Sequence, residues 1–314
     1  MIKKLISNFI KKFLSKYFNK FLERRNSIII FRNGSAIGDH IYMSSIIREI
    51  FIREKKKIFL FTNYYEFYLN NPRVRKIFKI NKKNFFWFFL RNLKGKSILE
   101  FDSLFSKKNK DKHFLFFHKK NIHLAQAMSE HFNLNINYEN LKNEFFFSQN
   151  EIESFKYKIP LPEKFSLIQS TTKKTFTKNK EWKINGMQTI VNSFENINWI
   201  QIGKSGEPIL KNCKTIFDLE LREIAYVIYR CNFLVTYEGL FNHIASCFNK
   251  KNFLIHTGFL PVEAFFYQNN ILVERNSNMN CYPCFKLNCK SHIKDCEENL
   301  KEEFVINKIR SNIY

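Results

Sequence analysis

Asp39 is a candidate general base, because it follows Gly38 at the end of a glycine-bearing turn and stands where a helical pattern begins. Glycine lets the backbone approach a ligand where a Cβ atom would clash. The N-terminus of a helix stabilises an ionised carboxylate, and an ionised carboxylate can take a proton from a hydroxyl group. The alternative is that Asp39 only caps the helix, a position at which Asp is common.

Lys180 is a candidate ligand for phosphate oxygens. It stands two residues before Trp182, and Thr171 and Thr172 follow an apolar run a few residues earlier. An ammonium group can stabilise a departing phosphate, and threonine hydroxyl and backbone N–H groups can donate to the same oxygens. The alternative is a solvated lysine-rich loop, because four further lysines lie within residues 173–183 and only the spacing to Trp182 singles out Lys180.

A third candidate group, Glu238, Gly239, Leu240 and His243, lies where an apolar run meets a helical pattern. An acid at the end of a strand can bind ribose hydroxyls, and the N-terminus of the following helix is an anion site. These residue types therefore fit a nucleotide. For His243 the alternative is a helix histidine that forms a buried hydrogen bond.

Four of the seven cysteines are grouped, at Cys281, Cys284, Cys289 and Cys296, with the spacing Cys-x2-Cys-x4-Cys-x6-Cys. Four thiols this close in sequence can bind a structural zinc ion tetrahedrally. The alternative is a compact loop with buried, inert thiols, since a single Cys-x2-Cys pair does not match a standard zinc finger. The odd number of cysteines indicates a reducing compartment.

The chain around the first candidate residues has the pattern of a Rossmann-like unit. The apolar run 28–31 predicts a buried parallel strand, and after the turn a helical pattern extends from His40 to Ile52. Strand, glycine-bearing turn and helix open such a unit. We expect further strands at 58–61, 98–101 and 114–117, and a helix at 121–134.

A second alternating series follows the polar segment 148–164, which contains two prolines and is interpreted as an interdomain linker. The expected strands are 165–169, 199–202, 233–236 and 252–256, and the expected helices are 183–194, 221–230 and 240–248. Alternation in both halves predicts an α/β protein with two parallel sheets covered on both faces. The predicted organisation is a basic amphipathic helix over 1–26, one domain over 27–155 and another over 156–314.

Residues 1–25 predict the basic amphipathic helix. Apolar residues recur at helical spacing, while the other face carries eight Lys and Arg residues and a single acid, Glu23. Large aromatic side chains opposite a basic face favour a position in the plane of an anionic membrane. The alternative is that the apolar stripe packs against the body of the protein or against another subunit.

The chain carries a formal net charge of +24, which raises nucleic acid and an anionic membrane surface as partners. Codon bias is the alternative source of this charge, because Lys, Asn, Ile and Phe are abundant. With 45% hydrophobic residues the chain is not disordered. It has no apolar run of about 18 residues that would span a membrane, and no secretory signal, so we expect a cytoplasmic protein.

Three of these patterns together resemble glycosyltransferase family 9. Residues 32–39 are similar to the family's N-terminal signature, which ends in Ile/Leu-Gly-Asp. Thr171-Thr172 with Lys180-x-Trp182 is similar to its Thr-Thr and Lys-x-Trp elements, and residues 235–245 resemble its Asp-x-Gly-x-x-His-Leu-Ala stretch. The order and spacing fit from about residue 28 to about residue 256. The sequence Cys-Tyr-Pro-Cys-Phe at 281–285 is similar to the tail of many heptosyltransferases.

The resemblance implies a GT-B fold, in which two Rossmann-like domains face a central cleft, and an inverting transfer that needs neither metal nor cofactor. Heptose from ADP-heptose would move to a lipopolysaccharide core or a related cell-surface glycan. The acceptor, a lipid-linked glycan, would bind the N-terminal domain near Gly38, with Asp39 as the base and Arg32, Lys82 and Lys83 near its acidic groups. The donor would bind Thr171, Thr172, Lys180, Glu238, Gly239, Leu240 and His243.

Together with the amphipathic pattern of residues 1–25, the resemblance leads us to expect a protein held peripherally on the cytoplasmic face of the inner membrane, with no nucleic acid as partner. Glu238 stands where the family usually has Asp, and Gly239 comes one place early, so a non-catalytic relative is an alternative. The other alternative is a basic nucleic-acid-binding protein with a zinc site at the cysteines. In that class binding would fall steeply with salt, but the three motifs would have no role.

Overall fold

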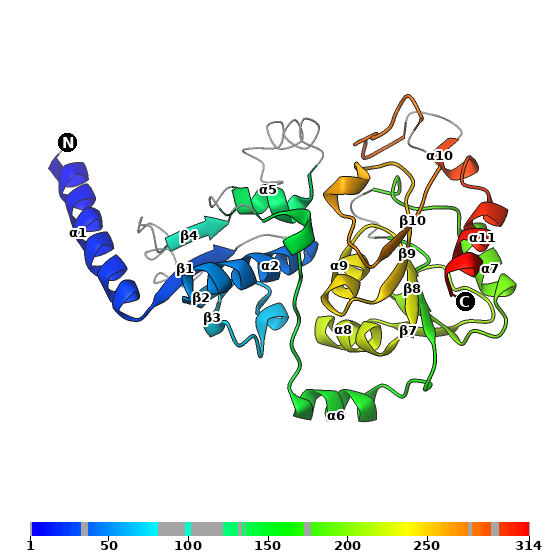
Figure 1. Ribbon diagram of the computed structural model, residues 1–314, viewed down its shortest axis with the longest axis horizontal. Coiled ribbons are helices and arrows are strands. Elements are labelled where there is room, and N and C mark those ends of the chain that lie inside the picture. Colours follow the sequence, from blue (N-terminus) through cyan, green and yellow to red (C-terminus); the bar gives the residue numbers. More distant parts are fainter. Residues whose placement is uncertain are drawn as a thin grey trace. The chain divides into compact units, whose positions relative to one another are not determined.

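The computed structural model of the chain is an α/β protein with two parallel sheets, as the sequence predicts (Figure 1). The structure describes residues 2–32, 37–80, 98–101, 122–130, 134, 136–172, 177–275, 278–289 and 295–313, with only the backbone of 2–12 and 98–101. The chain divides into unit 1, Met1–Phe147, and unit 2, Ser148–Tyr314.

The sheet of unit 1 has the order β3-β2-β1-β4, and every neighbouring pair is parallel. Its strands are β1 (Ser27–Arg32), β2 (Lys57–Thr62), β3 (Val74–Lys79) and β4 (Ile98–Phe101). The central strand β1 is buried along its whole length, which is why its sequence is a continuous apolar run. The order of the strands reverses beside β1, between β1 and β4.

Helices α2 (Ile37–Glu54) and α5 (Leu124–Glu130) belong to unit 1, together with the 3-10 turns η1 (Tyr65–Tyr68) and η2 (Tyr138–Asn140). The described helix α5 is shorter than the predicted helix 121–134. The strand predicted at 114–117 lies outside the described residues. Strand β3 was not predicted, because at the edge of the sheet it exposes charged side chains and has no continuous apolar run.

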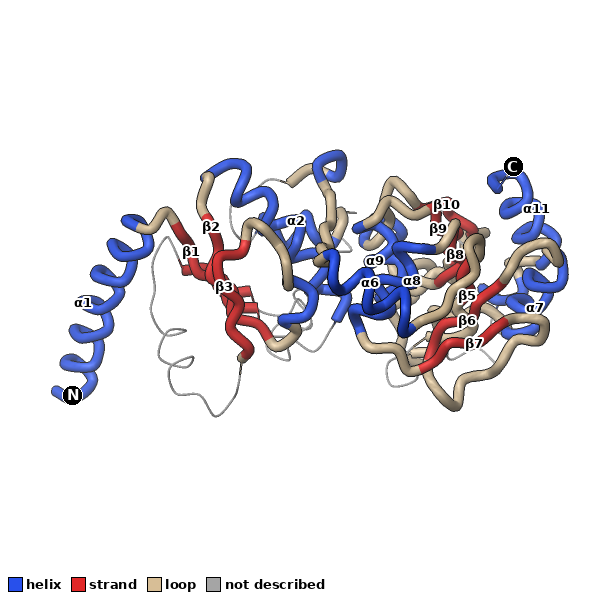
Figure 2. The backbone as a smooth tube through the Cα atoms, turned by 90° about the horizontal axis from the view of Figure 1, so that it is seen from below, coloured by secondary structure: helices blue, strands red, loops and turns tan. Residues whose placement is uncertain are grey.

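Helix α1 (Ile2–Arg24) leads directly into β1, and only its C-terminal end approaches that strand (Figure 2). There Leu22 is buried against Ile29, Phe31 and Phe61, and Leu14 and Phe18 pack beside it. The predicted helix is therefore present, and its last turns are part of the core of unit 1.

Unit 2 contains a six-stranded sheet with the order β10-β9-β8-β5-β6-β7, all parallel. The order reverses between β5 and β8, as in dinucleotide-binding Rossmann folds, where ligands bind outside the carboxyl ends of the strands at this reversal. The strands are β5 (Ser166–Ile168), β6 (Trp199–Gly203), β7 (Lys214–Phe217), β8 (Phe233–Thr236), β9 (Lys251–Ile255) and β10 (Asn270–Val273).

The described helices of unit 2 that follow the first strand are α7 (Ile184–Ser193), α8 (Leu221–Arg230), α9 (Leu240–Cys247), α10 (Asp295–Glu298) and α11 (Glu302–Ile313), with the 3-10 turn η3 (Val262–Ala264). Helices α7 and α11 enclose one core cluster with Trp182 and Trp199. The edge strands β7 and β10 were not predicted.

The polar segment interpreted as a linker contains helix α6 (Gln149–Lys158). Ser148 and Glu151 form a capping box at its start. Glu151 also accepts two hydrogen bonds from Arg222 of α8, at 2.5 and 3.0 Å, and the ring of Phe155 lies 5.5 Å from that of Tyr226. The segment is therefore a helix docked on unit 2, and it belongs to that compact unit, which begins at Ser148.

Candidate functional site

In unit 2, two of the residues predicted to bind a nucleotide, Lys180 and Glu238, meet at the strand reversal. Thr171 follows β5 and Glu238 follows β8, and Lys180 reaches Glu238 from the loop before α7. The Nζ atom of Lys180 lies 2.8 Å from Oε1 of Glu238, and the side chains are 14% and 9% exposed. The same Nζ atom lies 5.0 Å from the centroid of the Phe259 ring, from a loop that sequence patterns did not indicate.

Trp182 explains why the spacing to Lys180 matters. Its side chain is buried in the core of unit 2, and its Nε1 donates a hydrogen bond to the carbonyl of Leu300 at 3.0 Å. Gly186 permits this packing, because a Cβ atom there would lie 2.5 Å from the Trp182 ring. The anchored tryptophan fixes the backbone two residues beyond Lys180 and so helps to hold the ammonium group at the strand ends.

Two buried polar atoms at this place have no hydrogen-bond partner within the described part of the chain. They are Oε2 of Glu238 and Oγ1 of Thr171. An unsatisfied buried polar group costs about 1–3 kcal/mol, so a ligand that supplies a hydroxyl or N–H group would be stabilised here. Thr172 is different, since both its N–H and its hydroxyl donate to Oε1 of Glu181, at 2.8 and 2.9 Å.

Gly239 caps the N-terminus of α9 with a φ of 150°, a conformation that side chains rarely allow. Glu238, Gly239 and Leu240 are half-buried, and no described atom lies within 4 Å of a Cβ built on Gly239. The first N–H groups of a helix lack intrahelical partners and attract anions. The glycine that departs from the family pattern is thus required by the backbone at the start of α9.

A buried asparagine network fixes this helix end to the sheet. Oδ1 of Asn242 accepts hydrogen bonds from Asn252 of β9 at 3.0 Å and from Asn270 of β10 at 2.8 Å. Asn252 in turn accepts one from Thr236 at 2.9 Å. The orientation of the α9 N-terminus therefore depends on polar side chains from three strands.

His243 is a buried residue of α9, with its Nδ1 atom 2.9 Å from the hydroxyl oxygen of Tyr267. Burial, followed by the positive charge of Lys180, lowers the pKa of His243 to about 3. The imidazole is therefore neutral near pH 7. Its contact with Tyr267 is the buried hydrogen bond that the sequence left open as the alternative for His243.

In unit 1, Asp39 lies in the first turn of α2, inside the helix rather than at its cap. Its Oδ2 atom is 3.1 Å from Nη2 of Arg32, at the carboxyl end of β1, and both side chains are buried. Nε and Nη1 of Arg32 have no hydrogen-bond partner among the described residues. Burial raises the pKa of Tyr68, which lies near this pair; Arg32 opposes the shift and Asp39 adds to it. Residues 33–36, Lys82 and Lys83 lie outside the described ranges.

The four grouped cysteines all line one small cavity of about 40 Å³, together with Asn179 and Gly258. Backbone N–H groups of Cys284 and Phe285 donate to the carbonyls of Gly258 and Phe259, both at 3.0 Å. The cysteine segment thus supports the loop that carries Phe259 beneath Lys180. Over the described ranges, no group of three or more His, Cys, Asp or Glu side chains is arranged to hold a metal ion.

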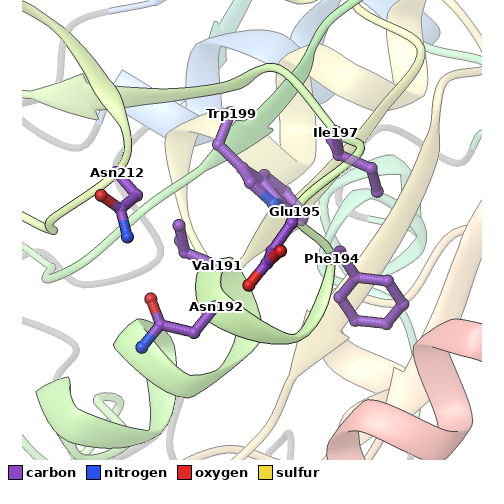
Figure 3. Close-up of a pocket in the computed structure, with 7 residues that line it drawn as sticks. All are labelled: Val191, Asn192, Phe194, Glu195, Ile197, Trp199 and Asn212. Carbon is purple, nitrogen blue, oxygen red and sulfur yellow. The ribbon is translucent and has the colours of Figure 1, made fainter.

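A larger cavity of about 270 Å³ lies elsewhere in unit 2 (Figure 3). It lies at the amino end of β6, where Trp199 begins the strand, and is therefore remote from the carboxyl ends that carry the candidate site. Its lining residues are Val191, Asn192, Phe194, Glu195, Ile197, Trp199 and Asn212.

Comparison with known proteins supports the fold but gives no match in sequence. No family model matches the chain, and no curated protein matches it. Among solved structures, the glycosyl transferase family 9 protein from Veillonella parvula superposes with a TM-score of 0.65 at 14% identity, over 91% of this chain and 97% of that one. E. coli ADP-heptose LPS heptosyltransferase II gives 0.64 at 11% identity, over 91% and 98%.

A third structure is the iron-containing dodecameric heptosyltransferase TibC from enterotoxigenic E. coli, in complex with ADP-D-β-D-heptose. It gives a TM-score of 0.63 at 11% identity, over 91% of this chain and 76% of that one. The chain therefore has the GT-B fold of these glycosyltransferases.

Proposed function

We propose that this chain is a glycosyltransferase that takes its sugar from a nucleoside-diphosphate donor bound to unit 2. The observation that carries the proposal is the Lys180–Glu238 pair at the strand reversal, 2.8 Å apart and next to the Gly239 end of α9. An ammonium group and free helix N–H groups suit a diphosphate. The free oxygen of Glu238 suits a ribose hydroxyl.

The proposed donor is ADP-heptose. It is the ligand of TibC, and the E. coli enzyme of the same fold is an ADP-heptose transferase. In this chain the diphosphate would compete with Glu238 for Lys180. Lys180 would then neutralise the negative charge that grows on the leaving nucleoside diphosphate.

The proposed acceptor is a hydroxyl group of a lipid-linked glycan, such as a lipopolysaccharide core, at the cytoplasmic face of the inner membrane. Asp39 would remove the proton as the acceptor oxygen forms its bond to the anomeric carbon and the bond to the diphosphate breaks, with inversion. Nη2 of Arg32, 3.1 Å from Oδ2 of Asp39, would hold the carboxylate in position.

Isothermal titration with ADP, UDP and GDP tests the donor site directly. We expect ADP to bind, Lys180→Ala to weaken binding at least about tenfold through loss of charge-assisted contacts, and Lys178→Ala to change it little. Lys178 is a matched control, since it is exposed and two residues away. Binding of none of the three nucleotides would reject the transferase proposal, whereas preference for UDP or GDP would reject only ADP-heptose.

A further inference from the structure

Helix α1 carries two adjacent rows of apolar side chains, and the described fold uses one of them. Leu14, Phe18 and Leu22 pack toward the sheet of unit 1. Phe13, Tyr17 and Phe21, here called the aromatic row, precede them by one position each. Their exposed fractions are 52%, 59% and 45%, although these are among the largest apolar side chains of the helix. The apolar stripe of the sequence is therefore partly core and partly surface.

A row of cations borders the aromatic row on its other side. Lys16, Lys20 and Arg24, here called the basic row, stand three positions after the three aromatic residues and are exposed. Residues three apart are neighbours on a helix surface. The guanidinium carbon of Arg25 also lies 5.0 Å from the centroid of the Phe21 ring. Each exposed ring therefore has a positive charge beside it.

We infer that the aromatic row and the basic row bind an anionic lipid surface, with the rings inserted and the cations at the lipid phosphates. Aromatic side chains favour the membrane interface, and Lys and Arg extend from their apolar stems to reach the head groups. Anionic lipids attract basic residues near the surface. No described helix is long and apolar enough to cross a membrane, so the helix would lie in the plane of the interface.

Charge favours lipid over a second copy of the chain as the occupant of this surface. A symmetric pairing of two aromatic rows would bring two basic rows together, and like charges at short distance destabilise such an interface. The inference rests on α1 alone. It holds whether or not the chain transfers a sugar.

The test is co-sedimentation of the full chain with vesicles of phosphatidylcholine alone and with added phosphatidylglycerol. One variant carries Phe13→Ala, Tyr17→Ala and Phe21→Ala, and a second carries Lys16→Gln, Lys20→Gln and Arg24→Gln. We expect binding only to the anionic vesicles, and a loss of at least about tenfold in partitioning for both variants.

Two controls match these changes. Lys156→Gln, Lys164→Gln and Lys211→Gln remove the same charge from exposed sites in unit 2, and Tyr157→Ala removes a side chain that is 93% exposed. Substitution is preferable to truncation, because Leu22 is 1% exposed in the core of unit 1. Thermal unfolding of both α1 variants checks that the exposed substitutions leave the fold intact.

Several results would overturn the inference. One is equal binding to neutral and anionic vesicles; another is unchanged binding of the aromatic-row variant. A third is a dimer, measured by light scattering, that becomes a monomer in the aromatic-row variant, since this would make the row a subunit interface. Loss of binding in the unit 2 charge control would show that total charge, and not α1, attracts the vesicles.

Discussion

Asp39 forms a buried ion pair with Arg32, so a substitution at this residue affects both stability and chemistry. Asp39→Asn should lower turnover by about 10²–10⁴-fold if Asp39 is the general base. It should also destabilise the fold by about 3–5 kcal/mol, because a buried Arg32 loses its charge partner. Turnover per folded molecule and urea unfolding measure the two effects separately.

Arg32→Gln is the control for the Asp39 prediction. It breaks the same ion pair and leaves a carboxylate in place, so we expect comparable destabilisation with a smaller loss of turnover. If Asp39→Asn keeps near-normal turnover, Asp39 has no part in proton transfer.

His243 should make stability depend on pH. Its pKa is about 3 in the folded chain, against an ordinary histidine value of 6.5, so the unfolded chain binds more protons between these values. The contribution of His243 to the free energy of unfolding is complete above pH 6.5 and is lost as pH falls from 6.5 to about 3. Between pH 7 and pH 5, the free energy of unfolding should fall by about 2 kcal/mol more in the wild type than in His243→Gln. Equal falls in urea titrations would show that His243 does not titrate in this way.

At the scale of elements, the start of α9 depends on Gly239. Gly239→Ala should destabilise unit 2 by about 1–3 kcal/mol and weaken ADP binding, because alanine disfavours a φ of 150° and the helix N-terminus would shift. Asn249→Ala is a matched control, since Asn249 has a φ of 51° just beyond the other end of α9. Calorimetric titration should show normal ADP binding in Asn249→Ala; an equal loss in both variants would remove the special role of Gly239.

The cysteines should differ in reactivity because the structural elements that carry them expose some thiols and bury others. Cys281 and Cys289 are exposed, whereas burial raises the pKa of Cys213 and Cys231 to about 12. Iodoacetamide at pH 8 should therefore label the first two in the native chain and the second two only after unfolding. Mass spectrometry locates the labels. Protection of Cys281 and Cys289 that a chelator removes would instead support the zinc site, which stays a prediction.

At the scale of the molecule, each unit has its own sheet, and the proposed donor site is built from unit 2 alone. The fragment 148–314 should therefore fold and bind ADP. The fragment 159–314 should be less stable, because it lacks α6 and the Glu151–Arg222 pair. Thermal unfolding and titration with ADP compare them. If the full chain binds ADP and a folded 148–314 does not, the donor site requires unit 1.

Most of the fold was predictable from local patterns. Buried strands such as β1 and β8 appear as apolar runs, because both faces of a covered parallel sheet exclude water. The missed strands β3, β7 and β10 are all edge strands. Strands β3 and β7 carry charged side chains and are at most partly buried, so they lack the continuous buried run of a central strand. Strand β10 carries no charge, but its apolar run is limited to Ile271, Leu272 and Val273. The docked helix α6 was missed for a related reason. Its sequence is polar, and a capping box and ion pairs hold the helix in place.

The sequence by itself determined the α/β class, the order of the elements and the residue types of the candidate site. Only the tertiary structure decided that Lys180 and Glu238, 58 positions apart in sequence, meet, with the ring of Phe259 beside Lys180. It also decided which apolar row of α1 packs and which stays exposed. The physical reason is that periodicity records which residues avoid water, whereas contacts between distant segments depend on how the sheet brings its carboxyl ends together.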